Sequence, residues 1–347
     1  MKAVAKLRAA DGAMELIDIP RPDPGPGEVL VRIEAAGICG TDVAIRHWFE
    51  NVVGQYAPNF PLIVGHEFGG RVMSGSHDLR FKEGTLVAIN PQIACGRCEY
   101  CNLGRPTLCV NRRLMGGKVN GGWAEYVSVP ERNLYALPDG THPAISALAE
   151  PLSVATHAVC ERVVPQPGDV VVVIGAGPIG LSCLILALAA GASKVFVTGI
   201  GADRERLELA RQLGGIPIDV EADDPLAIVR DAQEDGADIV YETSGSHAVM
   251  TQAISLARRT GRIGLIGLCH CESHVLTTPL VLRELTMIGS RGYNDTTWSV
   301  MMRVLPKIEP QVLALVSHTM SLDRYDEALD LVERKEANKV ILQPHIA

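Results

Sequence analysis

The sequence lacks the features that would place the protein in a membrane or on nucleic acid. It has no run of 18 apolar residues, and its first stretch, MKAVAKLRAADGAMELIDIP, has no continuous apolar core. We therefore expect neither a membrane span nor a secretory signal, and we expect a cytoplasmic protein. Positive charge is in deficit, with 32 Lys and Arg against 40 Asp and Glu. This balance argues against nucleic-acid and membrane-surface partners and leaves small molecules.

Internal repeats and low-complexity tracts are also missing, and the composition is that of a folded chain. Hydrophobic residues make up 47% and charged residues 21% of the sequence, close to the globular average. A length of 347 residues suits two domains. The first half contains short β-branched runs separated by Gly and Pro, at 28–38, 85–89, 123–130 and 133–138. These runs predict an antiparallel sheet or barrel.

From about residue 151 the pattern changes to alternating strands and helices. An apolar strand over 170–174 is followed by a Gly-rich turn, a helix over 178–190 and a second strand over 194–198. Such alternation with fully apolar strands predicts a parallel sheet that is covered on both faces. The fold class is therefore α/β, with a doubly wound domain over 151–292. We expect the tail, 293–347, to return to the domain formed by 1–150.

Cysteine is scarce, with nine residues in the chain, yet four of them fall within 95–109. Cys95, Cys98, Cys101 and Cys109 have the spacing C-x2-C-x2-C-x7-C. In a reducing compartment such a cluster favours metal over disulfides, and four thiolates complete the tetrahedral shell of a structural zinc ion. The alternatives are an iron–sulfur cluster, whose bacterial run ends in x3-C-P, and unligated thiols. Here the last gap is seven residues and Val110 follows.

A second set of possible ligands follows two apolar strands. Cys39 lies in GICGTD, and His66 and Glu67 lie in GHEFGG. A mixed set of Cys, His and carboxylate can hold zinc while one position stays open to substrate, where the ion acts as a Lewis acid. The alternative is a buried Cys and a solvated His-Glu turn. Glu150, before Pro151, is a further carboxylate at the domain junction, with an acid near a helix N-terminus as the alternative.

A dinucleotide-binding loop is predicted directly after the strand at 170–174. Gly175, Gly177 and Gly180 form G-x-G-x-x-G, and Pro178 and Ile179 lie between the last two glycines. The glycines permit a tight turn, close approach of a pyrophosphate and packing of the helix on the strand. The diphosphate would bind at the helix N-terminus. The expected cofactor is NAD or NADP.

The residue that should hold the adenine ribose is missing from its usual place. An Asp or Glu is expected at the end of the second strand, where this chain has Gly199. Asp203 is the nearest acid, with Arg204 and Arg206 beside it. The arginines could pair with a 2′-phosphate, or all three could lie on the solvated face of the next helix. The choice between NAD and NADP stays open.

The motifs GICGTD, GHEFGG, CGRCEYCNLGRPTLC, AEPLSVATHAV and GAGPIG occur in this order. With them the chain closely resembles the zinc-containing medium-chain dehydrogenases, especially the polyol (sorbitol-like) and threonine dehydrogenase branches, over nearly its whole length. The resemblance implies a GroES-like catalytic domain over 1–150 and 293–347 and a Rossmann domain over 151–292. It also implies a homo-oligomer, either a dimer or a tetramer.

The resemblance further implies the roles of individual residues. Cys39, His66 and Glu67 would surround a catalytic zinc, with Glu150 as a direct or water-linked fourth partner, and the four-cysteine lobe would carry a structural zinc. Thr41 would relay the proton of the reacting hydroxyl, and Asp42 would brace that turn. The implied reaction is hydride transfer between a secondary alcohol (a polyol, sugar or sugar derivative) and NAD(P). The alternatives are an L-threonine 3-dehydrogenase and a dinucleotide-binding protein without catalysis.

The chain departs from both branches at several positions. Ala44 replaces the His usually found three residues after the relay hydroxyl, and only His47 lies nearby. Tyr293 occupies the place of a substrate-binding Arg, with Arg291 two residues earlier. The loop 47–60 is individual to this chain, and its aromatic residues, Trp48, Phe49 and Tyr56, either shape the substrate pocket or pack the loop itself.

Overall fold

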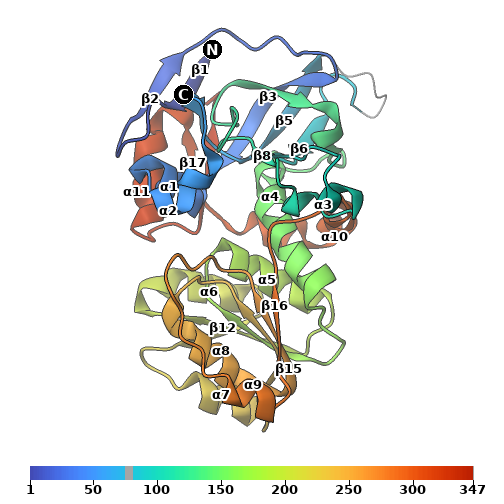
Figure 1. The fold of residues 1–347 in the computed structure, drawn as a ribbon, viewed down its shortest axis with the longest axis vertical. Coiled ribbons are helices and arrows are strands. Elements are labelled where there is room, and N and C mark those ends of the chain that lie inside the picture. The colour runs from blue at the N-terminus through green and yellow to red at the C-terminus, as the bar shows by residue number, and fades with distance from the viewer. Residues whose placement is uncertain (75–80, 347) are drawn as a thin grey trace. The chain divides into compact units, whose positions relative to one another are not determined.

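The computed structural model describes residues 1–74 and 81–346, and the chain divides into two compact units (Figure 1). The first unit comprises Met1–Glu150 and Val316–Ala347, and the second comprises Pro151–Leu315. The predicted α/β class with a doubly wound second domain is confirmed. None of the helices in the described part of the chain combines the length and the apolar character that a membrane span requires.

The first unit is built on a sheet with the strand order β10-β6-β5-β3-β18-β17, in which β9 also pairs with β3. The strands are β3 (Glu28–Gly37), β5 (Glu67–Ser74), β6 (Leu86–Ile89), β9 (Tyr126–Pro130), β10 (Leu134–Ala136), β17 (Val316–Ser321) and β18 (Lys339–Gln343). Alternate residues of β3, namely Val29, Val31 and Ile33, face the hydrophobic core, as the period of two in a strand requires.

Smaller elements complete this unit. A second sheet has the order β2-β1-β4, and β7 pairs with β8. These strands are β1 (Lys2–Lys6), β2 (Met14–Asp18), β4 (Leu62–Ile63), β7 (Gln92–Ile93) and β8 (Arg113–Leu114). The helices are α1 (Gly40–His47), α2 (Glu50–Val53), α3 (Glu99–Asn102), α11 (Tyr325–Glu333) and the first half of α4 (Ile145–Thr156).

The strand register brings the start of β5 and the end of β18 to the end of β3. Gly37 pairs with Glu67 on one side and with Ile341 on the other. Trp123, which is fully buried, donates a hydrogen bond from Nε1 to the carbonyl of Gly37 at 3.1 Å. Strands from before and after the second unit therefore meet at Gly37 in the first unit.

The second unit contains a parallel sheet of six strands in the order β13-β12-β11-β14-β15-β16, flanked by helices (Figure 1). The strands are β11 (Val170–Ile174), β12 (Lys194–Gly199), β13 (Ile216–Asp219), β14 (Ala237–Glu242), β15 (Ala257–Leu265) and β16 (Thr286–Gly289). The helices are α5 (Pro178–Ala189), α6 (Arg204–Gln212), α7 (Pro225–Ala232), α8 (Met250–Leu256), α9 (Thr278–Leu282) and α10 (Asp295–Leu313). In such sheets ligands bind at the carboxyl ends of the strands.

The return to the first unit lies later in the chain than the sequence pattern suggests. We expected it at 293, but α10 belongs to the second unit and the division falls at Leu315. Tyr293 and Trp298 are buried here and pack edge to face, with ring centroids 5.5 Å apart. Pro306 and Pro310 interrupt the α10 sequence, so the helix does not stand out as a continuous pattern.

Shortening a buried side chain of β18 should destabilise the first unit. Leu342 is fully buried and lies opposite Ala36 of β3, so we expect Leu342→Ala to lower the free energy of unfolding by about 2–5 kcal/mol. The same substitution at Leu282, which is 77% exposed, should change it by less than about 0.5 kcal/mol. Urea unfolding followed by circular dichroism measures both, and equal effects would contradict the return of the tail.

Candidate active site and metal centres

Three of the predicted ligands come together at the end of the first unit's central strands. Single ligand atoms of Cys39, His66 and Glu67 all lie within 4.8 Å of one another. Cys39 precedes α1 at the end of β3, and Glu67 begins the neighbouring strand β5. Because β3 and β5 are hydrogen-bonded in register, residues 27 positions apart in the sequence reach one site.

The side chain of Asp42 contacts both Cys39 and His66. Its side chain is fully buried, and its Oδ2 accepts a hydrogen bond from the Cys39 backbone N–H at 2.8 Å. Its Oδ1 lies 3.5 Å from His66 Nδ1. A carboxylate at one ring nitrogen of a histidine orients the ring and leaves the other nitrogen to bind a metal. The brace expected at Asp42 is thus accompanied by a contact to His66, which the sequence did not indicate.

The electrostatics of the site favour a cation at the imidazole. Burial alone would lower the pKa of His66, but the charges of Asp42 and Cys39 outweigh it and raise that pKa well above its ordinary value. A zinc ion on the free ring nitrogen would satisfy the same negative charges as the proton. The Cys, His and carboxylate set is also one that zinc prefers in sites with an open position.

A buried lysine that the sequence analysis missed pairs with Glu67. Lys339 Nζ donates to both Glu67 carboxylate oxygens, at 2.9 and 2.7 Å, and to the carbonyl of Ile38 at 3.0 Å. Burial lowers the pKa of Lys339, but the neighbouring charges of Glu67 and Cys39 raise it above the usual value overall. A cation at Cys39 and His66 would therefore share the Glu67 carboxylate with Lys339.

Gly37 makes room for this pair. A Cβ atom at residue 37 would lie 2.2 Å from Glu67 Oε2, which no side chain could tolerate without displacing the carboxylate. The glycine at the end of β3 therefore sets the position of Glu67.

Glu150 lies apart from the three-residue ligand group. It is buried inside α4, and its charge acts on Lys339. Among the described residues, the group of ligand atoms within 4.8 Å contains Cys39, His66 and Glu67 without Glu150. The helix runs through Pro151, so Glu150 is not an acid of the first turn. Its role as a direct or water-linked partner stays a prediction.

Thr41 lies in the first turn of α1, and its Oγ1 is 3.8 Å from Cys39 Sγ. This places the predicted relay hydroxyl beside the ligand group. His47, by contrast, is engaged at both ring nitrogens, with Asp11 at 2.8 Å and Glu333 at 3.0 Å. His47 therefore ties α1 to its neighbours.

Two aromatic residues of the loop 47–60 have local partners. Trp48 donates from Nε1 to Glu50 at 2.8 Å and packs edge to face on Phe60. Phe49 stacks on His47 and is 50% exposed. Tyr56 lies close to Gly117, where an added Cβ would be 3.3 Å from the ring. The contacts of Phe49 lie within the loop, whereas Tyr56 and Trp48 also contact residues outside it, Trp48 through Lys6 Nζ at 5.9 Å from its ring centroid.

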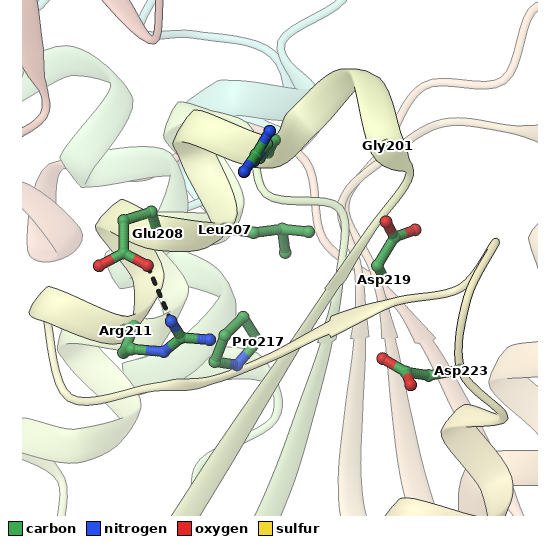
Figure 2. Close-up of a pocket in the computed structure, with 8 residues that line it drawn as sticks. Gly201, Leu207, Glu208, Arg211, Pro217, Asp219 and Asp223 are labelled. Atoms are coloured by element: carbon green, nitrogen blue, oxygen red, sulfur yellow. Dashed lines mark hydrogen bonds and ion pairs between the residues drawn. The ribbon is translucent and has the colours of Figure 1, made fainter.

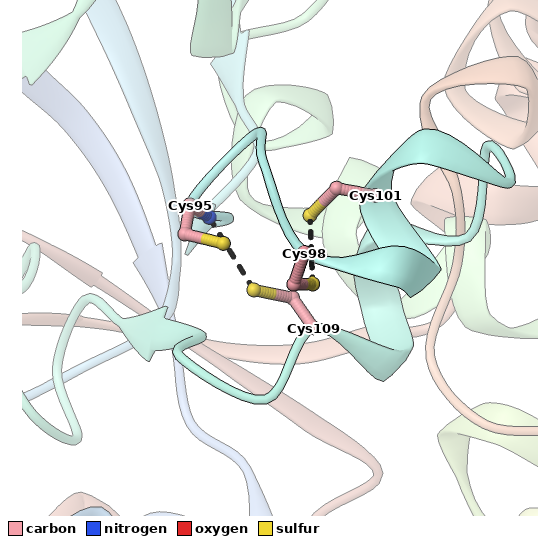
Figure 3. Close-up of side chains that lie close together, drawn as sticks. All are labelled: Cys95, Cys98, Cys101 and Cys109. Carbon is pink, nitrogen blue, oxygen red and sulfur yellow. Dashed lines mark hydrogen bonds between the residues drawn. The ribbon is translucent and has the colours of Figure 1, made fainter.

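The four cysteines of the lobe 95–109 point into one small space (Figure 3). Cys98 and Cys101 sulfurs are 3.5 Å apart, and the Cys95 backbone N–H donates to Cys109 Sγ at 3.3 Å. Gly96 has φ +71°, a conformation suited to glycine, and this lets the chain turn around the sulfurs.

The pKa values of two thiols in this lobe shift in opposite directions. A backbone hydrogen bond from Arg97, followed by the Cys109 side chain, lowers the pKa of Cys95 to about 6. Burial, followed by the neighbouring Cys98 thiol, raises the pKa of Cys101 to about 12. Four thiolates at this distance repel one another unless a cation lies between them. The donor set fits a closed, structural zinc site.

The three glycines after β11 have the geometry of a dinucleotide-binding turn. Gly175 has φ +104°, and an added Cβ at Gly180 would lie 1.9 Å from the Gly175 carbonyl oxygen. An added Cβ at Gly177 would meet no atom within 4 Å, and Gly177 is the N-cap of α5, with Pro178 and Ile179 opening the helix. The backbone at Gly177 is thus open to a pyrophosphate at the helix N-terminus.

A cavity of about 660 Å³ lies at the carboxyl ends of β12 and β13 (Figure 2). Its lining residues are Gly201, Arg204, Leu207, Glu208, Arg211, Pro217, Asp219 and Asp223. Of the predicted ribose-binding residues, Arg204 is in this lining, whereas Gly199 and Asp203 are not. The sequence pattern did not point to Asp219 and Asp223, because they lie at and after the end of the third strand, β13, and not the second.

Replacing one cysteine of the lobe should remove its metal. We expect Cys98→Ser to lower the zinc content from two ions per chain to one, because serine does not replace a thiolate ligand, and to lower the thermal midpoint. Cys160→Ser changes a cysteine outside both ligand groups and serves as the control. Metal analysis by mass spectrometry measures the content, and unchanged zinc in Cys98→Ser would contradict the assignment.

Removing the charge of Lys339 should leave Glu67 buried without its partner. We expect Lys339→Met to cost about 3–5 kcal/mol of unfolding free energy. The double variant Glu67→Gln/Lys339→Met should be less destabilised than the sum of the two single variants, because it leaves no unpaired charge. Urea unfolding of all three variants tests this coupling, and strictly additive effects would rule it out.

The chain matches two protein families. Residues 25–139 match the "Alcohol dehydrogenase GroES-like domain" and residues 178–307 match the "Zinc-binding dehydrogenase" family. These matches confirm the predicted GroES-like and Rossmann domains and the predicted zinc and NAD(P) cofactors.

Individual relatives cover nearly the whole chain. It is 35% identical to an L-threonine 3-dehydrogenase of Bacillus velezensis over 99% of both chains, and 31% identical to a sorbitol dehydrogenase of Halalkalibacterium halodurans, also over 99% of both. A solved zinc-binding dehydrogenase from Sinorhizobium meliloti 1021, bound to NADP, superimposes with a TM-score of 0.88 at 29% identity over 99% of both chains. The chain therefore belongs to the zinc-containing medium-chain dehydrogenases of the alcohol dehydrogenase superfamily.

Proposed function

We propose that this zinc- and NAD(P)-dependent dehydrogenase oxidises a secondary hydroxyl group, with L-threonine as its leading substrate and polyols second. The sequence analysis placed polyols first and L-threonine as the alternative. The order is reversed because the chain is 35% identical to L-threonine 3-dehydrogenases and 31% identical to a sorbitol dehydrogenase.

The observation that carries the enzymatic proposal is the buried group of Cys39, His66 and Glu67. Within this group Glu67 is paired with the buried Lys339. A protein that merely binds a dinucleotide has no physical need for this charged, buried set, since burying charges is costly. The third alternative, a binding protein without catalysis, is therefore disfavoured.

The chain's own residues would hold the reacting groups and move the proton. Zinc, when bound, supplies a Lewis acid that lowers the pKa of a coordinated hydroxyl, and the nicotinamide accepts hydride. Cys39 and His66 would bind the ion, and Asp42 would fix the orientation of the His66 ring. Thr41, beside the Cys39 sulfur, would accept the hydroxyl proton of the substrate and pass it on. Lys339 holds Glu67 in position.

Substrate comparison tests the proposed specificity. L-threonine carries an ammonium and a carboxylate group that polyols lack, so the two classes demand different partners in the pocket. Initial rates with L-threonine, sorbitol, other polyols, sugars and sugar acids, each with NAD and NADP, should give the highest kcat/KM for L-threonine. A kcat/KM for a polyol ten times that for L-threonine would show that polyols are the preferred substrates.

Replacing Cys39 separates chemistry from cofactor binding. We expect Cys39→Ser to abolish turnover, because it removes a thiolate ligand, while the affinity for the nicotinamide cofactor stays within about threefold of wild type. Steady-state kinetics and isothermal titration calorimetry measure the two quantities, with Cys160→Ser as the control. Normal turnover in Cys39→Ser would show that the catalytic assignment is wrong.

The remaining predictions concern assembly and place in the cell. We propose a homo-oligomer of two or four subunits, which light scattering coupled to size-exclusion chromatography measures directly. A cytoplasmic location remains a proposal that rests on the composition.

A further inference from the structure

Gly199, which lies where a ribose-binding acid is expected, has an acidic neighbour on the next strand of the sheet. Dinucleotide-binding sheets usually hold the ribose hydroxyls with an Asp or Glu at the end of the second strand. In this chain β12 ends at Gly199, and the residue paired with it in the next strand is Asp219, at the end of β13. The two positions are direct neighbours across the sheet.

A side chain at residue 199 would find its space already filled. An added Cβ would lie 3.1 Å from Asp203 Cβ and 3.2 Å from Leu207 Cδ2. Asp203 itself is turned toward the start of the helix, where it accepts from the Ile200 N–H at 3.3 Å and pairs with Arg206 at 3.2 Å. Neither position therefore offers a carboxylate to the cavity.

Asp219, by contrast, places a carboxylate in the lining of the cavity. Its Oδ1 accepts a hydrogen bond from the Glu221 N–H at 3.1 Å, while its Oδ2 would be 3.9 Å from a Cβ built on Gly201. Figure 2 shows Asp219 next to Gly201, on the side of the cavity away from Glu208 and Arg211. One oxygen is thus fixed by the backbone. The other lies near Gly201, where Glu221 Oε2 would be closer still to the same added Cβ, at 2.9 Å.

The charges around this space disfavour a phosphate. Asp223 also lines the cavity, and Glu221 accepts from the Gly201 N–H at 2.8 Å. Two arginines line the cavity. Arg211 is paired with Glu208 at 2.9 Å, whereas Arg204 forms none of the described ion pairs. A 2′-phosphate, with a charge of about −1.5 to −2 at neutral pH, would meet several carboxylates at short range.

We propose that Asp219 replaces the missing acid of the second strand, accepts hydrogen bonds from the adenine-ribose hydroxyls and makes the enzyme select NAD over NADP. This inference rests on the proposed dehydrogenase function, because that function requires the cofactor. It concerns the residues around the adenosine end of the cofactor. The rival is recognition of a 2′-phosphate by Arg204, which would reverse the preference.

Calorimetric titration of the zinc-loaded protein tests this inference without turnover. Wild type should bind NAD more tightly than NADP, and it should bind 5′-AMP more tightly than 2′,5′-ADP, since these fragments probe only the adenosine end. Asp219→Asn should weaken NAD binding roughly tenfold, because a charge-assisted hydrogen bond is lost, and should not weaken NADP binding. The ratio of the two affinities should therefore fall by about tenfold.

Asp231→Asn is the matched control, because it removes the same charge from an exposed position of α7 outside the cavity lining. It should leave both affinities unchanged. Tighter binding of NADP or of 2′,5′-ADP by wild type would overturn the inference, as would an unchanged affinity ratio in Asp219→Asn. The fragment comparison in wild type decides the matter even if that variant does not fold.

The outcome is separable from the proposed function. Selective NAD binding together with no turnover on any alcohol would contradict the dehydrogenase proposal and leave the role of Asp219 standing. Turnover with a clear preference for NADP would support the dehydrogenase proposal and contradict the role of Asp219.

Discussion

The buried ion pair between Lys339 and Glu67 is the constraint on which the catalytic centre depends. It lies beside Cys39 and His66 and fills the space left by the missing side chain of Gly37. A buried Glu67 carboxylate without a partner would strongly destabilise the fold. The ligand group therefore depends on the docking of β18 against β3, because β18 carries Lys339. The pair therefore links the packing of the sheet to the chemistry at its end.

Closely spaced negative charges are balanced differently in the two metal centres. In the lobe 95–109, four sulfurs share one small space and a single cation can satisfy them all. At Cys39 and His66, part of the charge is already balanced by Lys339, and Asp42 stabilises positive charge on the imidazole. A cation there need not be surrounded completely, and this is the condition for a substrate oxygen to reach it.

Much of this arrangement could be predicted from the sequence, because the signals are local. The apolar run of β11, the glycines after it and the spacing of the four cysteines each specify their own geometry. Lys339 was missed because a lysine before VILQ resembles the exposed start of a strand, and its partner lies 272 residues away. Asp219 could not be predicted, because the sequence rule concerns the second strand alone, while the pairing of β12 with β13 is a tertiary property. The end of the second unit was placed too early because Pro306 and Pro310 mask α10.

The interrupted first unit has a consequence for synthesis on the ribosome. β3 and β5 emerge early, but β18 follows the whole of the second unit in the chain. At typical translation rates, β3 and β5 wait on the order of ten seconds or more for β18. During that interval the Glu67 carboxylate lacks its lysine, and the end of β3 at Ala36 and Gly37 lacks its partner strand. The Rossmann unit, being continuous, can fold first, and the nascent catalytic unit is the stage at which chaperones would be needed.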